Sequence, residues 1–491
     1  MSVRRALPRA VVVGVVGVFL SAGSCTDPGP PAPTGPVWSP GTMLPSLRET
    51  RRGLVDVRGL AHTHSIYSHD ACDNAPVDDN GVRDAVCLDD LRRGLCQTRH
   101  DFVMFTDHDS DFETIEFPAT LLFEAARGDE LVEHDVALVD DGGATTARLP
   151  TANRTRCDDG TTQLIMAGSE SGLMPVGLER HATDDDTLTG ARTYGTLEQT
   201  NADAIHDAGG LVLLAHPEDF SVEQLRLLPV DGFEMYNLHR NTLANAGAAL
   251  ELVVRLNEGD TSLPHPDLVL APIFQEDPLY LERWGRVLAS GLRRTTTMGT
   301  DSHRNTFRSL MADGERVDSF RRMMSAFSNH VLVDAAGADP LDDRALKAAM
   351  KAGRVYGAFE YLGHPRGFDV TATVGDTTVE LGGEASVGAT IRVTRPTLEQ
   401  LDPAAEAPLL TVRLLRAIDD DAGWEVVATL EHDDGPVLEH VTTVAGAYRA
   451  EVRMVPLHLR AFFGADDALL LADGRDFIWI YGNALYITET P

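Results

Sequence analysis

The sequence predicts an α/β domain, built as a parallel sheet or a β/α barrel, followed by a C-terminal all-β domain of the sandwich type. From residue 54 to about residue 355, short apolar runs alternate with segments in which apolar residues recur at helical spacing. Strands that alternate with helices in this way are typical of parallel sheets and barrels. After about residue 366 helical spacing becomes scarce, and apolar runs bounded by Gly, Asp and Pro succeed one another, as in β-sandwiches.

The elements of both domains follow from this patterning in chain order. In the first domain, strands are expected at Leu54–Leu60, Phe102–Phe105, Gln163–Met166, Leu211–Leu214, Gly232–Tyr236 and Thr295–Met298. Helices are expected between them, at Asp84–Thr98, Leu197–Ala208, Asn241–Asn257 and Pro278–Ser290. In the second domain, strands are expected at Phe368–Val374, Thr378–Leu381, Thr390–Thr394, Leu409–Leu415, Glu425–Leu430, Tyr448–Met454 and Asp476–Ile480.

The composition excludes several classes of protein. The 491-residue chain is 43% hydrophobic and 24% charged, which is ordinary for a globular protein and excludes a disordered one. Its 75 acidic and 42 basic side chains give a net charge of −33. Nucleic-acid binding needs clustered Lys and Arg, and an anionic membrane surface would repel so acidic a chain. We therefore expect neither a nucleic acid nor a membrane surface as a direct partner.

The N-terminus has the pattern of an export signal. Arg4, Arg5 and Arg9 precede an apolar run, Ala10–Leu20, and small residues that end at Cys25. The apolar run is too short for a bilayer core of about 30 Å, so residues 1–25 are predicted to be a signal peptide. Its end resembles a bacterial lipobox, with Cys25 as the lipidated residue, and the alternative is an ordinary signal peptide cleaved nearby.

The predicted export signal determines the cellular location that we expect for the protein. Residues 26–50 begin with a Pro-rich stretch and are predicted to be a tether between the anchor and the folded domains. No later segment is long and apolar enough to span a bilayer, so membrane contact is expected only through the lipid anchor. The protein is therefore expected to be a membrane-anchored lipoprotein of a bacterial cell envelope, or else periplasmic or extracellular.

The remaining cysteines are consistent with export. Cys72, Cys87, Cys96 and Cys157 are an even number, which in an exported protein indicates two disulfides with three possible connectivities. Metal ligation by the Cys72 thiolate is the alternative, because Cys72 lies close in sequence to the candidate site described next.

Histidines and acids follow the predicted strands of the first domain. These segments are His62-Thr63-His64 with Ser68-His69-Asp70, Thr106-Asp107-His108-Asp109, Gly168-Ser169-Glu170, Ala215-His216-Pro217 and Thr300-Asp301-Ser302-His303, with His181 on the loop after Glu170. The carboxyl ends of barrel strands meet at one rim, so these side chains are expected to converge there. Imidazoles combined with a few carboxylates suit zinc, manganese or iron better than calcium or magnesium.

In this order and spacing, the five motifs resemble the PHP (polymerase and histidinol phosphatase) superfamily. The resemblance implies a distorted (β/α)7 barrel over residues 51–365 that holds two or three divalent metal ions, followed by the β-sandwich-like domain at residues 366–491. The metal ligands that it implies are His62, His64, Asp70, His108, Glu170, His181, His216, Asp301 and His303. Glu170 would bridge two metals, His69 is the alternative to Asp70, and without His181 a dinuclear site would remain.

Further residues are candidates for catalysis and substrate binding. Glu170, Asp301 and Arg304 are the predicted catalytic residues. Arg180, Asn237 and Arg240 are predicted to bind substrate, together with His239 at the end of a predicted strand; ordinary surface or helix-start roles are the alternative. Asp107 and Asp109 are candidates to orient His108, or else they cap the following segment.

The function predicted from these features is metal-dependent hydrolysis of a small-molecule ester by a metal-bridging hydroxide, with a phosphoester favoured. Carboxylic ester or carbamate hydrolysis at the same site is the alternative, because the end of the chain, Trp479–Tyr486, is similar to exported PHP hydrolases of which some are grouped with carbamate hydrolases. A non-catalytic envelope binding protein is a third possibility. No protein partner of the β-rich domain is predicted.

Overall fold

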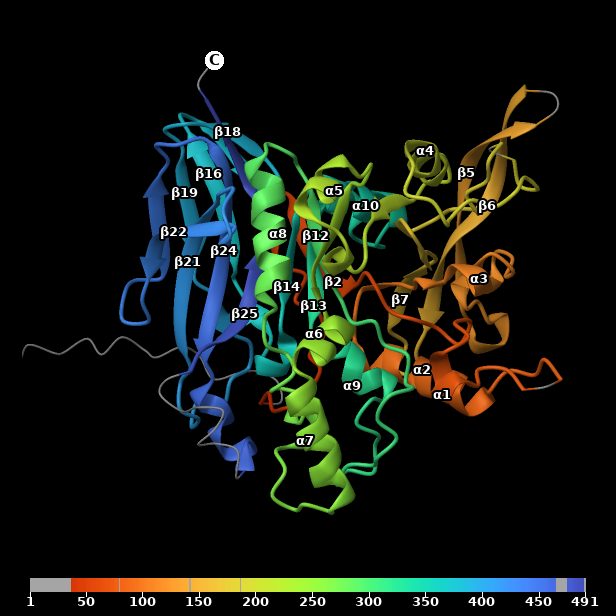
Figure 1. The fold of residues 1–491 in the computed structure, drawn as a ribbon, viewed down its shortest axis with the longest axis horizontal. Coiled ribbons are helices and arrows are strands. Elements are labelled where there is room, and N and C mark those ends of the chain that lie inside the picture. Colours follow the sequence, from red (N-terminus) through yellow and green to blue (C-terminus); the bar gives the residue numbers. More distant parts are fainter. Residues whose placement is uncertain (1–36, 79, 141–142, 186, 465–474, 490–491) are drawn as a thin grey trace, which may run out of the picture.

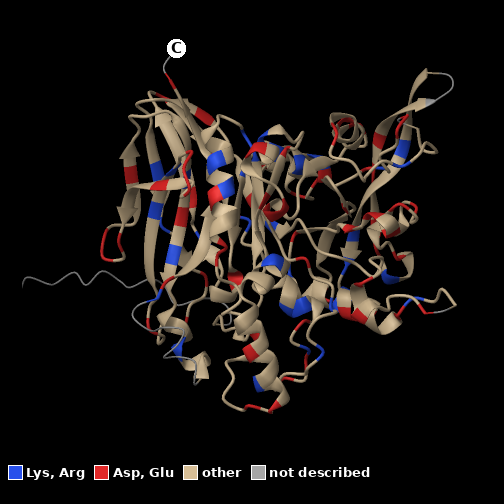
Figure 2. Ribbon diagram, viewed as in Figure 1, with Lys and Arg blue, Asp and Glu red and all other residues tan. Residues whose placement is uncertain are grey.

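The computed structural model describes residues 37–78, 80–140, 143–185, 187–464 and 475–489 (Figure 1). The predicted signal peptide, Cys25 and the first part of the predicted tether lie outside these residues. Within them, no helix is both long enough and apolar enough to cross a membrane. Figure 2 shows Asp and Glu on every part of the fold, with Lys and Arg among them, so the charge of −33 is dispersed.

The fold is mixed α/β and is organised around one large mixed sheet of 14 strands. Along its main path the strands follow the order β18-β26-β24-β25-β14-β13-β2-β3-β7-β6-β5. The central strands β2 (Leu54–Leu60), β3 (Phe102–Met104) and β7 (Thr162–Met166) are parallel, and β13 (Ser328–Asp334) flanks β2 in the antiparallel direction. The other strands on this path are β5 (Glu130–Asp140), β6 (Gly143–Arg156), β14 (Val355–Ala358), β18 (Glu384–Ser386), β24 (Gly446–Val455), β25 (Phe477–Gly482) and β26 (Leu485–Thr488).

Short ladders complete the first part of the chain. Parallel pairs are formed by β4 (Asp107–His108) with β8 (Ser169–Glu170), and by β11 (Gly232–Asn237) with β12 (Thr295–Gly299). An antiparallel pair is formed by β9 (Met174–Val176) with β10 (Leu211–Leu213). The ladders of the described residues do not join into one closed ring, so the seven-stranded barrel is not shown and stays a prediction.

The helices pack around these strands. Their bounds are α1 (Ala71–Asn74), α2 (Ala85–Thr98), α3 (Asp109–Phe112), α4 (Gln199–Asp207), α5 (Val222–Leu227), α6 (Leu238–Ala244), α7 (Ala246–Asn257), α8 (Pro278–Ala289), α9 (Phe320–Met324) and α10 (Asp343–Lys351). The single helix predicted at Asn241–Asn257 is instead two helices that meet at Asn245. The side-chain amide of Asn245 donates to the backbone carbonyl of Asn241 (2.9 Å). It thus competes for a carbonyl that a backbone N–H of the helix would otherwise use at the break.

The C-terminal part is built from strands, as predicted. From residue 365 to residue 489 the described residues contain strands and the short 3₁₀ helix η7 (Leu457–Phe462) but no α-helix. Its remaining strands are β15 (Pro365–Arg366), β16 (Asp369–Val374), β17 (Thr377–Glu380), β19 (Thr390–Thr394), β20 (Thr397–Leu398), β21 (Leu409–Ala417), β22 (Trp424–Leu430) and β23 (Val437–Val441). Because β25 pairs with β14, the large sheet runs without a break across the boundary predicted at residue 365.

Candidate metal centre

The strand ends bring most of the predicted ligands together. His62 and His64 follow β2, His108 ends β4, Glu170 ends β8, and Asp301 follows β12. His216 and His303 join them from the segments after β10 and β12. Because several of these strands are parallel, their carboxyl ends lie at the same side of the molecule.

A first group of ligand atoms centres on His64. Its Nε2 lies 3.3 Å from His62 Nε2, 3.3 Å from Glu170 Oε2 and 3.2 Å from Asp301 Oδ1. A cation with tetrahedral donors at about 2.0–2.1 Å holds those donors roughly 3.3 Å apart. The four side chains therefore have the spacing of a cation-binding group.

A second group lies beside the first and shares His64 with it. His64, His108 and His303 form this group, and the rings of His64 and His303 stack with centroids 3.7 Å apart. Asp70 faces it with both oxygens, one 3.3 Å from His108 Nε2 and the other 3.3 Å from His303 Nε2. His69, the alternative to Asp70, turns away, is 63% exposed and pairs with Asp111.

Glu170 links the groups. Its Oε2 lies 3.3 Å from His64 Nε2 and 3.2 Å from His108 Nδ1, and its Oε1 lies 2.7 Å from His216 Nε2. One carboxylate therefore faces imidazoles on both sides. This is the position that a bridging carboxylate requires.

The imidazole orientations fit metal ligands. In four histidines, Nδ1 is engaged by the protein while Nε2 faces the cluster. The Nδ1 partners are Glu234 Oε1 for His62 (2.6 Å), Ser68 Oγ for His64 (2.8 Å), Glu218 Oε1 for His216 (3.2 Å) and the carbonyl of Asp301 for His303 (2.9 Å). Among the described residues, buried His303 Nε2, Asp70 Oδ1 and Asp301 Oδ1 have no hydrogen-bond partner, as expected of atoms reserved for a cation.

The electrostatics of the cluster also favour a cation. Burial lowers the pKa of His64, but the adjacent carboxylates of Asp301 and Glu170 outweigh it and raise that pKa to about 10. Burial likewise lowers the pKa of His216, while Glu170 and Glu218 raise it to about 12. Burial opposes ionisation of Glu170 and Asp301, yet the surrounding imidazoles lower the pKa of both carboxyls. The carboxylates thus attract positive charge, and metal ions would compete with protons for it.

Two acids orient the histidines of β2, and one of them was not predicted. Asp107 accepts hydrogen bonds from Ser65 and from Ser68 Oγ (3.0 Å), and Ser68 holds His64. Asp107 therefore positions His64 rather than His108. The chain after β2 passes over Asp107 and brings Ser65 and Ser68 to its carboxylate. Glu234 on β11 is fully buried and accepts a hydrogen bond from His62. It was not predicted as a site residue, although an acid within an apolar predicted strand could have indicated such a role.

His181 is not brought to the cluster. Its Nδ1 lies 2.8 Å from the Tyr194 hydroxyl and its Nε2 2.9 Å from the carbonyl of Ile115, so both ring nitrogens are engaged elsewhere. Its ring packs against Phe112 and Phe117, and burial lowers its pKa to about 4. In its place His239, at the start of α6, reaches the cluster with Nδ1 3.3 Å from Asp301 Oδ2.

The predicted substrate-binding residues, and Arg304 among the predicted catalytic ones, are engaged by the protein itself. Arg304 Nε lies 2.9 Å from Asp90 Oδ2, and Arg240 Nε lies 3.3 Å from Asp277 Oδ2. Arg180 donates to the carbonyls of His181 and Asp207. Asn237 caps α6 by accepting from the backbone of Arg240, and it donates to Glu234 (3.1 Å).

The cysteines form two disulfides, Cys72–Cys87 and Cys96–Cys157, which confirms their number and selects one of the three connectivities. Cys72 is therefore not a thiolate ligand. Its bond to the first turns of α2 fixes the chain directly after Asp70, which belongs to the second group.

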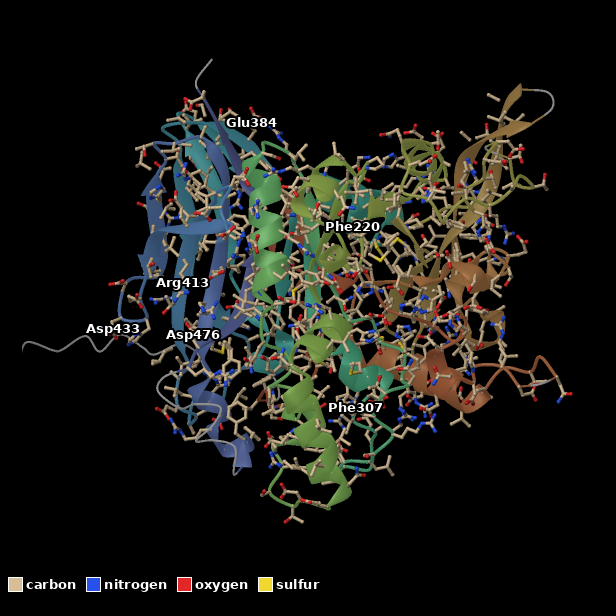
Figure 3. The ribbon with its side chains drawn as sticks, viewed as in Figure 1. Phe220, Phe307, Glu384, Arg413, Asp433 and Asp476 are labelled. Carbon is tan, nitrogen blue, oxygen red and sulfur yellow. A yellow bond between two sulfur atoms is a disulfide. The ribbon has the colours of Figure 1, made fainter. Side chains whose placement is uncertain are left out.

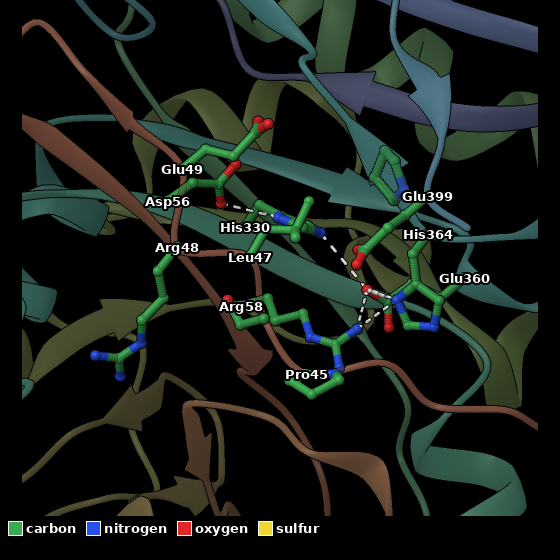
Figure 4. A pocket seen from close by; sticks show the side chains of 12 residues that line it. Pro45, Leu47, Arg48, Glu49, Asp56, Arg58, His330, Glu360, His364 and Glu399 are labelled. Atoms are coloured by element: carbon green, nitrogen blue, oxygen red, sulfur yellow. Dashed lines mark hydrogen bonds and ion pairs between the residues drawn. The ribbon is translucent and has the colours of Figure 1, made fainter. Parts of the chain in front are cut away.

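A separate cluster of buried charges lies beside the strands β2 and β13 (Figure 4). We call it the buried ion network; it consists of Asp56, Arg58, His330, Tyr356, Glu360 and His364. Arg58 donates to Glu360 (2.7 Å), and Asp56 accepts from His330 (2.9 Å) and from the Tyr356 hydroxyl (2.5 Å). The cavity at this network has about 20 Å³, room for about one water.

Comparison of the chain with protein-family models, with curated proteins and with solved structures found no match. The assignment of the site therefore depends on its geometry. That geometry defines groups of His, Asp and Glu that could hold a metal ion.

Proposed function

We propose that the protein is a metal-dependent hydrolase that cleaves an ester bond of a small-molecule substrate, with two or three ions of zinc, manganese or iron. The observation that carries this proposal is the position of Glu170 between His216 on one side and His64 and His108 on the other. When bound there, divalent cations supply a water whose pKa falls from about 15.7 towards about 7, and charge that stabilises the transition state.

The chain's own residues would hold and orient these cations. One position is formed by His62, His64, Glu170 and Asp301, and the other by Asp70, His108, Glu170 and His303, with His216 and His239 next to Glu170 and Asp301. Glu234 and Ser68 keep the Nε2 atoms of His62 and His64 directed at the first position. The nearby hydroxyls of Ser65 and Ser68 donate to Asp107, and Ser68 in turn holds His64.

We also propose that the short ladders form the wall of the distorted (β/α)7 barrel that the PHP resemblance implies. Hydrogen bonds between ladders support this arrangement. Leu178 bonds to Ala167 between β9 and β7, Glu234 bonds to Leu214 between β11 and β10, and the Asn329 side chain of β13 bonds to the backbone of Met298 in β12. With β13 paired to β2, the metal centre would lie at the carboxyl end of such a wall.

Two kinds of ester are candidates for the bond that is cleaved. A phosphoester is the first, as the resemblance implies. A carboxylic ester or carbamate is the second, and the arginines favour it. Arg180 and Arg240, predicted to bind substrate, and Arg304, predicted to be catalytic, are cations that could anchor a phosphate, and each is engaged by the protein. An uncharged ester needs no such anchor.

Release of nitrophenol from four substrates tests the proposal. The folded protein, loaded with manganese or zinc, is offered a phosphomonoester, a phosphodiester, a carboxylic ester and a carbamate. We expect metal-dependent turnover of at least one of them, and loss of at least about 100-fold in His62→Ala. The matched control is His432→Ala, which removes an exposed histidine of the β-rich part. Equal turnover by His62→Ala and wild type would contradict the proposal.

We further propose that the chain is exported and lipidated at Cys25. The two disulfides support this, because such bonds form and persist in oxidising compartments. Mass spectrometry of the mature N-terminus in a lipoprotein-processing bacterium tests it. A diacylated Cys25 that is lost in Cys25→Ala is expected, and an unmodified N-terminus would contradict it.

A further inference from the structure

A cavity of about 170 Å³ opens beside the candidate metal centre, between the start of α6 and the loop that follows His303. Asp70, Asp301 and His303 form one side of it. Its apolar lining consists of Leu238, Leu243, Phe307 and Met323, and Thr242, Thr300, Asn305 and Thr306 add polar groups. The cavity therefore joins metal-ligating atoms to an apolar surface within one space.

The apolar lining comes from three segments, which are α6, the loop after β12 and α9. Leu238 is the first residue of α6 and is 1% exposed, whereas Leu243, further along α6, is 61% exposed at the rim. Phe307 and Met323 are half-buried and pack from the loop after β12 and from α9. Figure 3 labels Phe307 and shows it beneath α6.

The loop that carries Phe307 is fixed by buried charge. One oxygen of Asp318 accepts from the backbone amides of Thr306 and Phe307, both at 2.7 Å. Arg316 holds Asp318 at 2.9 Å, and the Asn305 amide donates to the carbonyl of Asp70 (2.8 Å). Phe307 is thus positioned before any ligand arrives, which limits the entropy lost on binding.

The charged side chains in the lining do not favour a charged guest. Within the described lining, Arg304 is the only Lys or Arg, and it pairs with Asp90. Asp318 pairs with Arg316. A charged group placed against Leu238 and Phe307 would lose its hydration without gaining a partner, whereas an apolar group would gain free energy from its burial.

We propose that this cavity binds an apolar group of the substrate, a ring or a compact alkyl chain attached directly to the ester that meets the metal centre. The inference rests on the proposed function and defines the substrate class: an ester with an uncharged apolar substituent. The volume is adequate, because an apolar cavity of about 150 Å³ accommodates benzene. Phe307 and Leu243 are the specificity-determining residues.

Binding of two phosphonates to the metal-loaded protein tests the inference without catalysis. Phenylphosphonate and methylphosphonate carry the same metal-binding group and differ only in the apolar part. In calorimetry we expect phenylphosphonate to bind at least about tenfold more tightly. Phe307→Ala and Leu243→Asn should reduce that ratio to less than about threefold, with unchanged metal content and unchanged affinity for methylphosphonate. Phe307→Leu should retain most of the preference.

The matched control is Leu250→Asn, which changes an exposed leucine of α7 that does not line the cavity and should leave the ratio unchanged. Equal affinities for the two phosphonates in the wild type, or a ratio that survives Phe307→Ala, would overturn the inference and leave the hydrolase proposal intact. Failure of both phosphonates to bind a protein of normal metal content would overturn the inference and count against the proposed function as well.

Discussion

The metal centre and the buried ion network both combine histidines with acids and both draw residues from β2 or its carboxyl end, yet their atoms are arranged differently. Asp56 and Arg58 lie on β2, and His62 and His64 follow its end. In the network, both oxygens of Glu360 face donors, Arg58 at 2.7 Å and Ser328 Oγ at 2.7 Å. In the metal centre, the cluster-facing atoms of His62, His64 and Asp301 face one another.

The difference lies in the partners of the buried carboxylates. Among the described residues, Glu360 has the guanidinium of Arg58, whereas the ion-pair partners of Glu170 and Asp301 are all histidines. A network whose charges are matched by the protein stabilises the fold only as long as it stays complete. A cluster whose carboxylates face imidazoles can exchange the protons of those imidazoles for a metal ion. Changes to the two clusters should therefore have opposite consequences for folding and for metal binding.

The largest effect is expected from Arg58→Met. This change leaves Glu360 buried with only Ser328 and the nearby histidines, so the free energy of unfolding should fall by about 3–5 kcal/mol. Urea titration measures it, and metal content per folded molecule should not change. The control is Arg392→Met, whose exposed pair with Glu439 should contribute less than about 1 kcal/mol. A loss below 1 kcal/mol for Arg58→Met would contradict the account of the network.

Removal of metal should have the next largest effect, and it should act through the other cluster. At free metal 100 to 1,000 times the dissociation constant, binding adds about 2.7–4.1 kcal/mol of stability. A chelator should therefore lower the Tm of the loaded protein by several degrees. The chelator should have little effect on Glu170→Gln, because the carboxylate that links the groups is lost. An unchanged Tm after chelation of loaded wild type would contradict a metal centre.

The pH dependence of stability should separate the clusters further. Burial lowers the pKa of His330, but Asp56 and Glu360 raise it to about 9. The folded state therefore holds this proton more tightly than the unfolded chain does, whose pKa is about 6.5. The stabilisation is complete below about pH 6.5 and is lost as pH rises through about 9, a change on the order of 3 kcal/mol.

Urea unfolding of wild type and His330→Gln between pH 6 and pH 10 measures this effect. The difference in stability between them should be largest near pH 6 and should shrink towards pH 10. Treatment of both proteins with chelator removes the contribution of the metal centre. A difference that stays constant across this range would mean that His330 is not charged in the fold.

The smallest of these effects is expected from Glu234→Gln. The amide keeps the volume but weakens the hydrogen bond that orients His62. Changes to such supporting residues cost about 10–100-fold in metal affinity. Competition with a chromogenic chelator measures the affinity, and Glu223→Gln on exposed α5 is the matched control. Unchanged affinity would show that Glu234 does not position His62.

Local patterns were enough to predict the strands and the ligands directly after them. Leu54–Leu60 was predicted with its observed bounds, and His62, His64 and Glu170 lie where strand ends placed them. The hairpin β5–β6, which projects from the body, was missed because β6 is largely polar and the apolar residues of β5 come in short runs, so hydrophobic alternation is weak (Figure 1).

Contacts between segments that are distant in the sequence could not be predicted from local patterns. His181 is held away from the centre by Ile115 and Tyr194, and neither residue forms a motif with it. The pairing of Arg304 with Asp90 joins a loop to helix α2, more than two hundred residues away in the chain. The addition of β25 to β14 depends on the sheet edge that β14 offers, which no local pattern reveals.

The most direct test of the central claim is the number of divalent ions bound per folded molecule after reconstitution and gel filtration, measured by mass spectrometry of the elements. We predict at least two ions in the wild type, fewer in Glu170→Gln, and the wild-type number in His330→Gln, which alters only the buried ion network. Absence of bound ions in the wild type, or an equal loss in both variants, would contradict the account.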